Sequence, residues 1–103
     1  HYPEFASKVC KGVLSELDTS FGILVCGTGI GMSMCANKFK GVRAALVNST
    51  YLARMTRRHN DANVIAIGAG MVGMNVAKRM ADVFLATEFE GGRHERRVNK
   101  IPC

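Results

Sequence analysis

The sequence predicts an α/β protein built around a parallel sheet. Short apolar runs alternate along the chain with segments of helical periodicity, which is the order expected of strands joined by right-handed crossover helices. The apolar runs show no polar alternation, as is typical of strands that are buried on both faces. On this basis strands are expected over 21–26, 42–47 and 63–68.

Helices are predicted before, between and after these strands. The first is indicated by apolar residues at helical spacing, namely Phe5, Val9, Val13 and Leu17. Further helices are expected over about 32–38, 51–60 and 75–87. The helix over 51–60 has three candidate N-cap residues, Asn48, Ser49 and Thr50. A basic tail over 90–101 follows the last helix.

The composition is that of a soluble globular protein. The chain has 103 residues, of which 48% are hydrophobic and 21% are charged, and this length suits one domain. The formal net charge of +6 is compatible with nucleic acid, a membrane surface or phosphorylated small molecules as partners. No apolar run reaches the ~18 residues of a membrane span, so we expect no membrane association.

The cysteine pattern gives little sign of a metal or redox site. The sequence contains Cys10, Cys26, Cys35 and Cys103, with no CxxC spacing among them. Reduced thiols in a cytoplasmic protein are therefore the simpler interpretation, and we expect neither a metal nor a cofactor. Cys10 and Cys35 fall within helical patterns and are expected in the core.

The segment CGTGIG, over 26–31, lies between the first predicted strand and a helix. Sites in parallel sheets lie at the carboxyl ends of strands. Glycines let the backbone approach a ligand closely, and the N-terminus of the following helix favours an anion or a developing oxyanion. Met32 stands where GxGxxG would have its third glycine, so a nucleotide site is a weak interpretation. A tight turn with a buried cysteine is the structural alternative.

Cys26 occupies the last position of the first predicted strand. A nearby helix N-terminus favours the thiolate form of a cysteine. A thiolate in this setting can accept and return a proton near neutral pH, so Cys26 is a candidate general base.

The segments over 23–47, 57–70 and 88–101 resemble the sugar-phosphate isomerases of the ribose-5-phosphate isomerase type B and galactose-6-phosphate isomerase family. The resemblance covers almost the whole chain, and its glycine turn, HNDAN segment and GGRHxxR tail are specific. It implies a Rossmann-like three-layer α/β/α sandwich with a parallel sheet. Residues 1–103 would then form a single isomerase domain that lacks the N-terminal strand–helix–strand segment of the family.

By this resemblance, the chain would interconvert ribose 5-phosphate and ribulose 5-phosphate through a cis-enediolate, without a cofactor. Cys26 would be the base that moves a proton between carbon 2 and carbon 1. Preorganised N–H donors stabilise developing negative charge. The backbone that would hold the enediolate oxygen is that of Gly27, Thr28, Gly29, Ile30 and Gly31.

The resemblance also implies roles for residues that come later in the chain. His59 would be the acid that opens the furanose ring, and Asn60 would hold a sugar oxygen. Arg93 and Arg97 would bind the phosphate, and their spacing of four puts them on one side of a helix. The neighbouring Arg96, Lys100, His94 and Glu95 are left without a role. Gly70 stands where many family members have an arginine that reaches the substrate phosphate from a neighbouring subunit.

The implied partners are a sugar-phosphate substrate and further copies of the chain. The family forms dimers or tetramers with shared active sites, so His59 and Asn60 would serve the partner subunit's Cys26 in a homodimer or homotetramer. The length of the helix over 51–60 agrees with a shared site, because its ten residues carry the chain about 15 Å from the carboxyl edge of the sheet.

Two other functions stay open. One is a non-catalytic assembly subunit; the other is a basic nucleic-acid-binding module, although the sequence lacks the expected interleaving of aromatic and basic residues.

Overall fold

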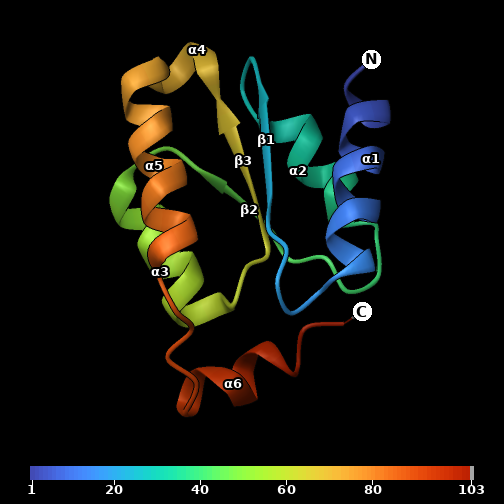
Figure 1. Cartoon of the computed structure of the whole chain (residues 1–103), viewed down its shortest axis with the longest axis vertical. Coiled ribbons are helices and arrows are strands. Elements are labelled where there is room, and N and C mark those ends of the chain that lie inside the picture. The colour runs from blue at the N-terminus through green and yellow to red at the C-terminus, as the bar shows by residue number, and fades with distance from the viewer. Residues whose placement is uncertain (103) are drawn as a thin grey trace.

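The computed structural model describes residues 1–102 and shows a parallel sheet with helices on both faces (Figure 1). Within this range the strands are β1 (Gly22–Cys26), β2 (Ala44–Val47) and β3 (Val64–Gly68), in the spatial order β1-β3-β2. The helices in the same range are α1 (Tyr2–Ser15), α2 (Ile30–Ala36), α3 (Thr50–Asn60), α4 (Ala69–Val72), α5 (Met74–Ala86) and α6 (Arg93–Val98). The predicted α/β fold is confirmed, and Cys103 lies outside the described residues.

β3 is the central strand and is buried along its whole length. It pairs in parallel with β1 and β2, and Val64 lies level with both Gly22 and Ala44. The strands therefore begin at a common edge, which we call the amino edge. Cys26 and Gly68 pair at the opposite edge, which we call the carboxyl edge.

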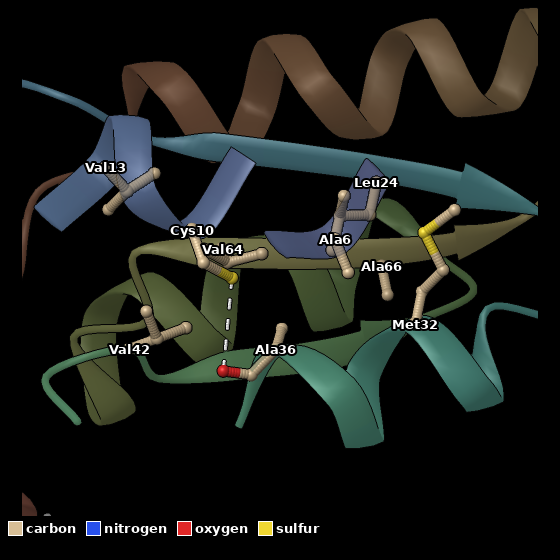
Figure 2. Close-up of a cluster of buried hydrophobic side chains, with 9 residues drawn as sticks. All are labelled: Ala6, Cys10, Val13, Leu24, Met32, Ala36, Val42, Val64 and Ala66. Carbon is tan, nitrogen blue, oxygen red and sulfur yellow. Dashed lines mark hydrogen bonds between the residues drawn. The ribbon is translucent and has the colours of Figure 1, made fainter. Parts of the chain in front are cut away.

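The side chains of β3 alternate between two apolar cores on opposite faces of the sheet. Val64 and Ala66 face α1 and α2, whereas Ile65 and Ile67 face α3 and α5. Besides Val64 and Ala66, Figure 2 shows the first core as Ala6, Cys10, Val13, Leu24, Met32, Ala36 and Val42. The second core is completed by Val47, Ala53, Ala62, Ala77, Met80 and Phe84. Full burial of one large apolar side chain contributes about 1.5–3 kcal/mol, so one strand holds both helical layers in place.

The first helix buries a stripe that only partly coincides with the one the spacing indicated, since Val13 is buried and Val9 packs against the core. Ala6, Cys10 and Val13 face the core, whereas Phe5 is 59% exposed. Leu17 lies beyond the end of α1 at Ser15 and is exposed. Small side chains occupy the contact because α1 packs closely against α2 and β1.

The second strand begins later than predicted, at Ala44 rather than at residue 42. The side chain of Asn37 explains the start, because its Oδ1 accepts from the Ala44 N–H (2.8 Å) and its Nδ2 donates to the Ala44 carbonyl (2.9 Å). The Arg43 N–H donates instead to Oδ1 of Asn63 (2.8 Å). The Arg43 carbonyl still accepts from the Val64 N–H (3.2 Å), so side-chain amides replace backbone partners at the N–H groups of Arg43 and Ala44.

The structure also defines the helix ends that the sequence predicted only approximately. Ser49 is the N-cap of α3, since its Oγ accepts from the Leu52 N–H at 3.1 Å. The helix expected over 32–38 begins two residues earlier, at Ile30, and ends at Ala36. The basic tail contains a helix, α6. None of the described helices is long and apolar enough to cross a membrane.

A buried arginine fastens the end of α3 to its surroundings. The guanidinium of Arg57 donates to Oδ1 of Asp61 (2.8 Å) and to the carbonyls of Ala62 (2.8 Å) and Thr87 (3.1 Å). It also lies 4.8 Å from the centre of the Phe21 ring. Arg57 therefore joins the last turn of α3 to the segments before β1 and after α5.

Replacing this arginine should destabilise the fold. Arg57→Ala leaves two carbonyls and Oδ1 of Asp61 without their donor, while Oδ2 of Asp61 keeps its contact with Arg43 (3.3 Å). We expect a loss of about 3 kcal/mol in the free energy of unfolding. Arg57→Lys should recover little, because an ammonium cannot reproduce the planar set of donors. Urea denaturation followed by circular dichroism measures the change. The control is Arg58→Ala, whose side chain is exposed, and a similar loss there would contradict the assignment.

Candidate functional site

Cys26 lies at the carboxyl edge, where β1 turns into α2. Its sulfur is half-buried and accepts a hydrogen bond from the Gly29 N–H at 3.1 Å. Gly29 is the N-cap of α2 and has a φ of +79°, a backbone conformation that glycine adopts without strain. This bond holds the sulfur against the backbone at the start of α2.

The other described cysteines differ from Cys26 in their surroundings. Cys10 is fully buried in the first core, and this burial raises the pKa of its thiol. Its Sγ lies 4.0 Å from the Ala36 carbonyl (Figure 2). Cys35 is half-buried and packs against the same core. Within residues 1–102, Cys26 is the cysteine that combines partial exposure with a place at a strand end.

The turn that follows Cys26 is packed backbone against backbone on the end of β3. A Cβ atom added to Gly68 would lie 2.6 Å from the Thr28 carbonyl oxygen, a distance that side chains do not tolerate. The Gly70 N–H donates to the Gly27 carbonyl at 3.1 Å. The Ile30 N–H donates to Oγ1 of Thr28 at 3.3 Å. These contacts fix the path of residues 27–31 relative to the sheet.

An apolar hollow of about 410 Å³ adjoins the turn at the carboxyl edge. Its lining comes from the turn, β2, α3 and α4, and consists of Thr28, Ile30, Leu46, Val47, Asn48, Leu52, Gly68 and Met71. Four of these side chains are more than 40% exposed, namely Ile30, Leu46, Leu52 and Met71. The hollow therefore presents apolar surface next to the predicted base.

His59 lies at the other end of the sheet, in the last turn of α3. Its ring stacks on that of His94, in the first turn of α6, with centroids 4.1 Å apart and planes 12° apart. The carboxylate of Glu90 faces both rings, with Oε2 3.9 Å from Nε2 of His59 and Oε1 3.5 Å from Nε2 of His94. Burial lowers the pKa of His94, and the positive charges of His59 and Arg93 lower it further.

The four cations of α6 and the residues after it surround one surface hollow of about 480 Å³. Its lining is Arg93, Arg96, Arg97, Asn99 and Lys100. Arg93 and Arg97 were predicted to bind phosphate, and the structure brings both to this hollow. Arg96 and Lys100, which the resemblance left without a role, line the same hollow. An anion held here would meet a strongly positive surface.

Asn60 is not grouped with His59 in the described structure. It is exposed and lines a different hollow, of about 310 Å³, together with Arg43 and Thr56. This separation arises because consecutive residues at the end of a helix point about 100° apart.

Within one chain, the predicted site residues therefore form two groups. Cys26 and residues 27–31 lie at the carboxyl edge, whereas His59 and the arginines of α6 lie beyond the amino edge (Figure 1). The five residues of β3 separate the two edges by about 13 Å.

Sequence reasoning missed Glu90 and left His94 without a role. The spacing of the two residues, four apart around the turn at Gly91 and Gly92, was the available signal. Together with His59 they form a group of three possible metal ligands within residues 1–102, with ligand atoms within 4.8 Å of one another.

Comparison with known proteins identifies relatives along the whole described chain. A family model described as Ribose/Galactose Isomerase matches residues 1–101, so the resemblance seen in the sequence is confirmed. The chain is 50% identical to a putative sugar phosphate isomerase of Bacillus subtilis and 48% identical to the ribose-5-phosphate isomerase B of Escherichia coli. Each match covers 97% of this chain and 66% of the relative, so the chain spans just under two thirds of their length.

Solved structures give the same result. The ribose-5-phosphate isomerase B of Clostridium thermocellum matches with a TM-score of 0.92 and 49% identity, over 98% of this chain and 68% of that chain. That of Mycoplasma genitalium, solved with bound ribulose-5-phosphate, matches with a TM-score of 0.94 and 46% identity, over 98% and 66%.

The close approach at Gly68 leads to a testable expectation. Gly68→Ala places a methyl group against the Thr28 backbone, which must move away because a carbonyl cannot rotate aside as a side chain can. We expect the variant to be less stable by about 1–3 kcal/mol, measured by urea denaturation. Gly12→Ala is the matched control, since a Cβ there meets nothing within 4 Å, and it should leave stability unchanged or higher. Equal stability of both variants would refute the packing argument.

Proposed function

The chain belongs to the ribose/galactose isomerase family, and on this premise we propose that it interconverts ribose 5-phosphate and ribulose 5-phosphate. The observation that carries the proposal is the Cys26 sulfur, held 3.1 Å from the Gly29 nitrogen at the carboxyl edge of a parallel sheet. Relatives with this reaction in their names, one of them solved with ribulose-5-phosphate, support the choice of substrate.

The proposed chemistry is a proton transfer between neighbouring carbons. The thiolate of Cys26 removes the proton from carbon 2 of the open-chain aldose, which gives a cis-enediolate. The resulting thiol returns the proton to carbon 1, while a second proton moves from oxygen 2 to oxygen 1, and the ketose is formed. N–H groups along Gly27–Gly31 are the proposed donors to the enediolate oxygen. Oγ1 of Thr28 accepts from Ile30, so its own proton can be donated to the sugar.

The second group of residues would handle the ring and the phosphate. His59 is the proposed acid for opening the furanose ring, and Asn60 the proposed partner of a sugar oxygen. Arg93 and Arg97 would hold the phosphate through charged, bidentate hydrogen bonds. The positive hollow on α6 is then a phosphate site and not a surface for nucleic acid.

We propose that the complete site forms between two copies of the chain, in a homodimer or homotetramer. The distance between the two groups within one copy supports this arrangement. A two-fold axis can bring His59 of one copy to the partner subunit's Cys26, because an isologous interface places each residue opposite a different one. The apolar hollow beside the glycine turn supplies surface suited to burial in such a contact.

The proposed reaction needs no cofactor, because the base, the acid and the anion donors all come from the protein. It does need a reduced thiol at Cys26. Reducing compartments preserve such thiols, and we therefore propose a cytoplasmic location.

The role of Cys26 can be tested by removing its sulfur. Cys26→Ala should lower turnover of ribose 5-phosphate by ~10²–10⁴-fold, the usual contribution of a proton-transfer group, while the circular dichroism spectrum stays unchanged. Cys35→Ala removes a second half-buried thiol and should stay active. Near-normal turnover by Cys26→Ala would reject its role as base. An inactive wild-type protein would favour the non-catalytic assembly subunit.

The shared site can be tested by mixing subunits. Cys26→Ala and His59→Ala should each be inactive alone, and hybrids formed by subunit exchange should regain activity. Each hybrid dimer would carry one site with both defects and one site with none. Exchange is followed by native mass spectrometry with differently tagged subunits. Demonstrated exchange without any return of activity would disprove sharing.

A further inference from the structure

Three side chains from three segments meet beyond the amino edge. His59 comes from α3, Glu90 from the connection between α5 and α6, and His94 from α6. The side chains of His59 and Glu90 are 39% and 47% exposed, whereas that of His94 is 9% exposed. The buried His94 ring is thus the inner member of the stack, and the more exposed His59 ring packs against it.

The backbone holds these side chains in position. The Glu90 N–H donates to the Arg58 carbonyl at 3.1 Å, which ties the connection to the last turn of α3. Gly91 and Gly92 reverse the chain, and the His94 N–H donates to the Gly91 carbonyl at 3.1 Å. Glu90 and His94 are therefore directed at the same point, one from each side of the reversal.

The surroundings of His94 disfavour a positive charge on its ring. Two protonated imidazoles 4.1 Å apart would repel each other. The charged groups that face the pair are Glu90 from the connection and Arg93 and Arg97 from α6. Burial and the neighbouring positive charges lower the pKa of His94, so a charge on this inner ring is disfavoured. The Glu90 carboxylate lies 3.9 Å from Nε2 of His59, on the more exposed side of the pair.

We propose that Glu90 and His94 are positioning residues that hold the His59 ring in the orientation it needs as the acid for sugar-ring opening; this inference rests on the proposed isomerase function. In this step the bond between carbon 1 and the ring oxygen breaks as that oxygen takes the proton from His59. The proton of the carbon 1 hydroxyl leaves to water, and water restores the proton on His59. The stacked His94 ring supplies a flat face for His59, and Glu90 supplies a carboxylate beside its Nε2.

The same three side chains do not suit a metal ion in this arrangement. Imidazole binds a metal in the plane of its ring at about 2.0–2.1 Å. Two rings that are 12° from parallel and 4.1 Å apart do not direct their nitrogens at one point. Arg93 and Arg97 would also repel a divalent cation. The geometry favours a stacked acid over a metal centre.

The decisive experiment separates ring opening from proton transfer at carbon 1. Exchange of the carbon 1 hydrogen of ribulose 5-phosphate with D₂O, followed by proton NMR, needs Cys26 but no ring opening. Isomerisation of ribose 5-phosphate, followed by a coupled assay, needs both steps. We expect Glu90→Gln and His94→Ala to lose isomerisation by about 10-fold, a part of the ~10²–10⁴-fold effect of an acid. Exchange should stay within about twofold, because the site at Cys26 is intact.

His94→Phe is the matched variant. It retains a flat, uncharged ring and should recover most of the isomerisation that His94→Ala loses. If exchange and isomerisation fall together in Glu90→Gln and His94→Ala, the two residues are structural and the proposal is wrong. If isomerisation is unchanged in both variants, the proposal is wrong as well.

A readout that does not depend on activity tests the cluster itself. In histidine NMR titrations, His59→Phe should raise the pKa of His94, because it removes a neighbouring positive charge. Glu90→Gln should lower the pKa of His94, because it removes a negative one. A pKa of His94 that moves in neither variant overturns the proposal even if the enzyme is active. A wild-type protein with neither exchange nor isomerisation refutes the proposed isomerase function, while these titrations still test the cluster.

Discussion

β3 is paired along both edges and buried on both faces, so the helices of the chain must divide into two layers to cover it. Its alternating side chains assign those layers, α1 and α2 to one face and α3 and α5 to the other. Parallel pairing then makes each crossover return from the carboxyl edge to the amino edge. The positions of Cys26 and His59 at opposite edges follow directly from this arrangement.

The end of α3 depends on an interaction that is remote from any substrate. Arg57 is buried against Asp61 and two backbone carbonyls, and His59 lies two residues further along. The Glu90 N–H bonds the carbonyl of Arg58, between them. The buried guanidinium of Arg57 thus fixes the last turn of α3, which carries His59 of the stacked pair. At the other edge, the contact of Gly68 with Thr28 gives the glycine turn a similarly fixed support.

Much of the fold could be predicted because the apolar runs coincide with buried strands. The start of β2 could not, since it depends on the Asn37 amide reaching Ala44 from another element. Cys26 was predicted from its place at a strand end and His59 from the family resemblance, and the structure supplies their surroundings. The stack on His94 could not be predicted, because it forms only when α6 folds back onto α3. Periodicity describes one element at a time, whereas these contacts join elements that the sequence keeps apart.

The strand order has a consequence for how the chain folds. β1 and β2 are successive strands in the sequence, yet neither pairs with the other, because β3 lies between them. During synthesis β2 must therefore wait for Val64–Gly68 before it gains its hydrogen-bonded neighbour among the described strands. Such non-local pairing slows folding and leaves an apolar strand open to association with other chains. Nascent chains that contain β2 but end before Val64 should accordingly be dependent on chaperones.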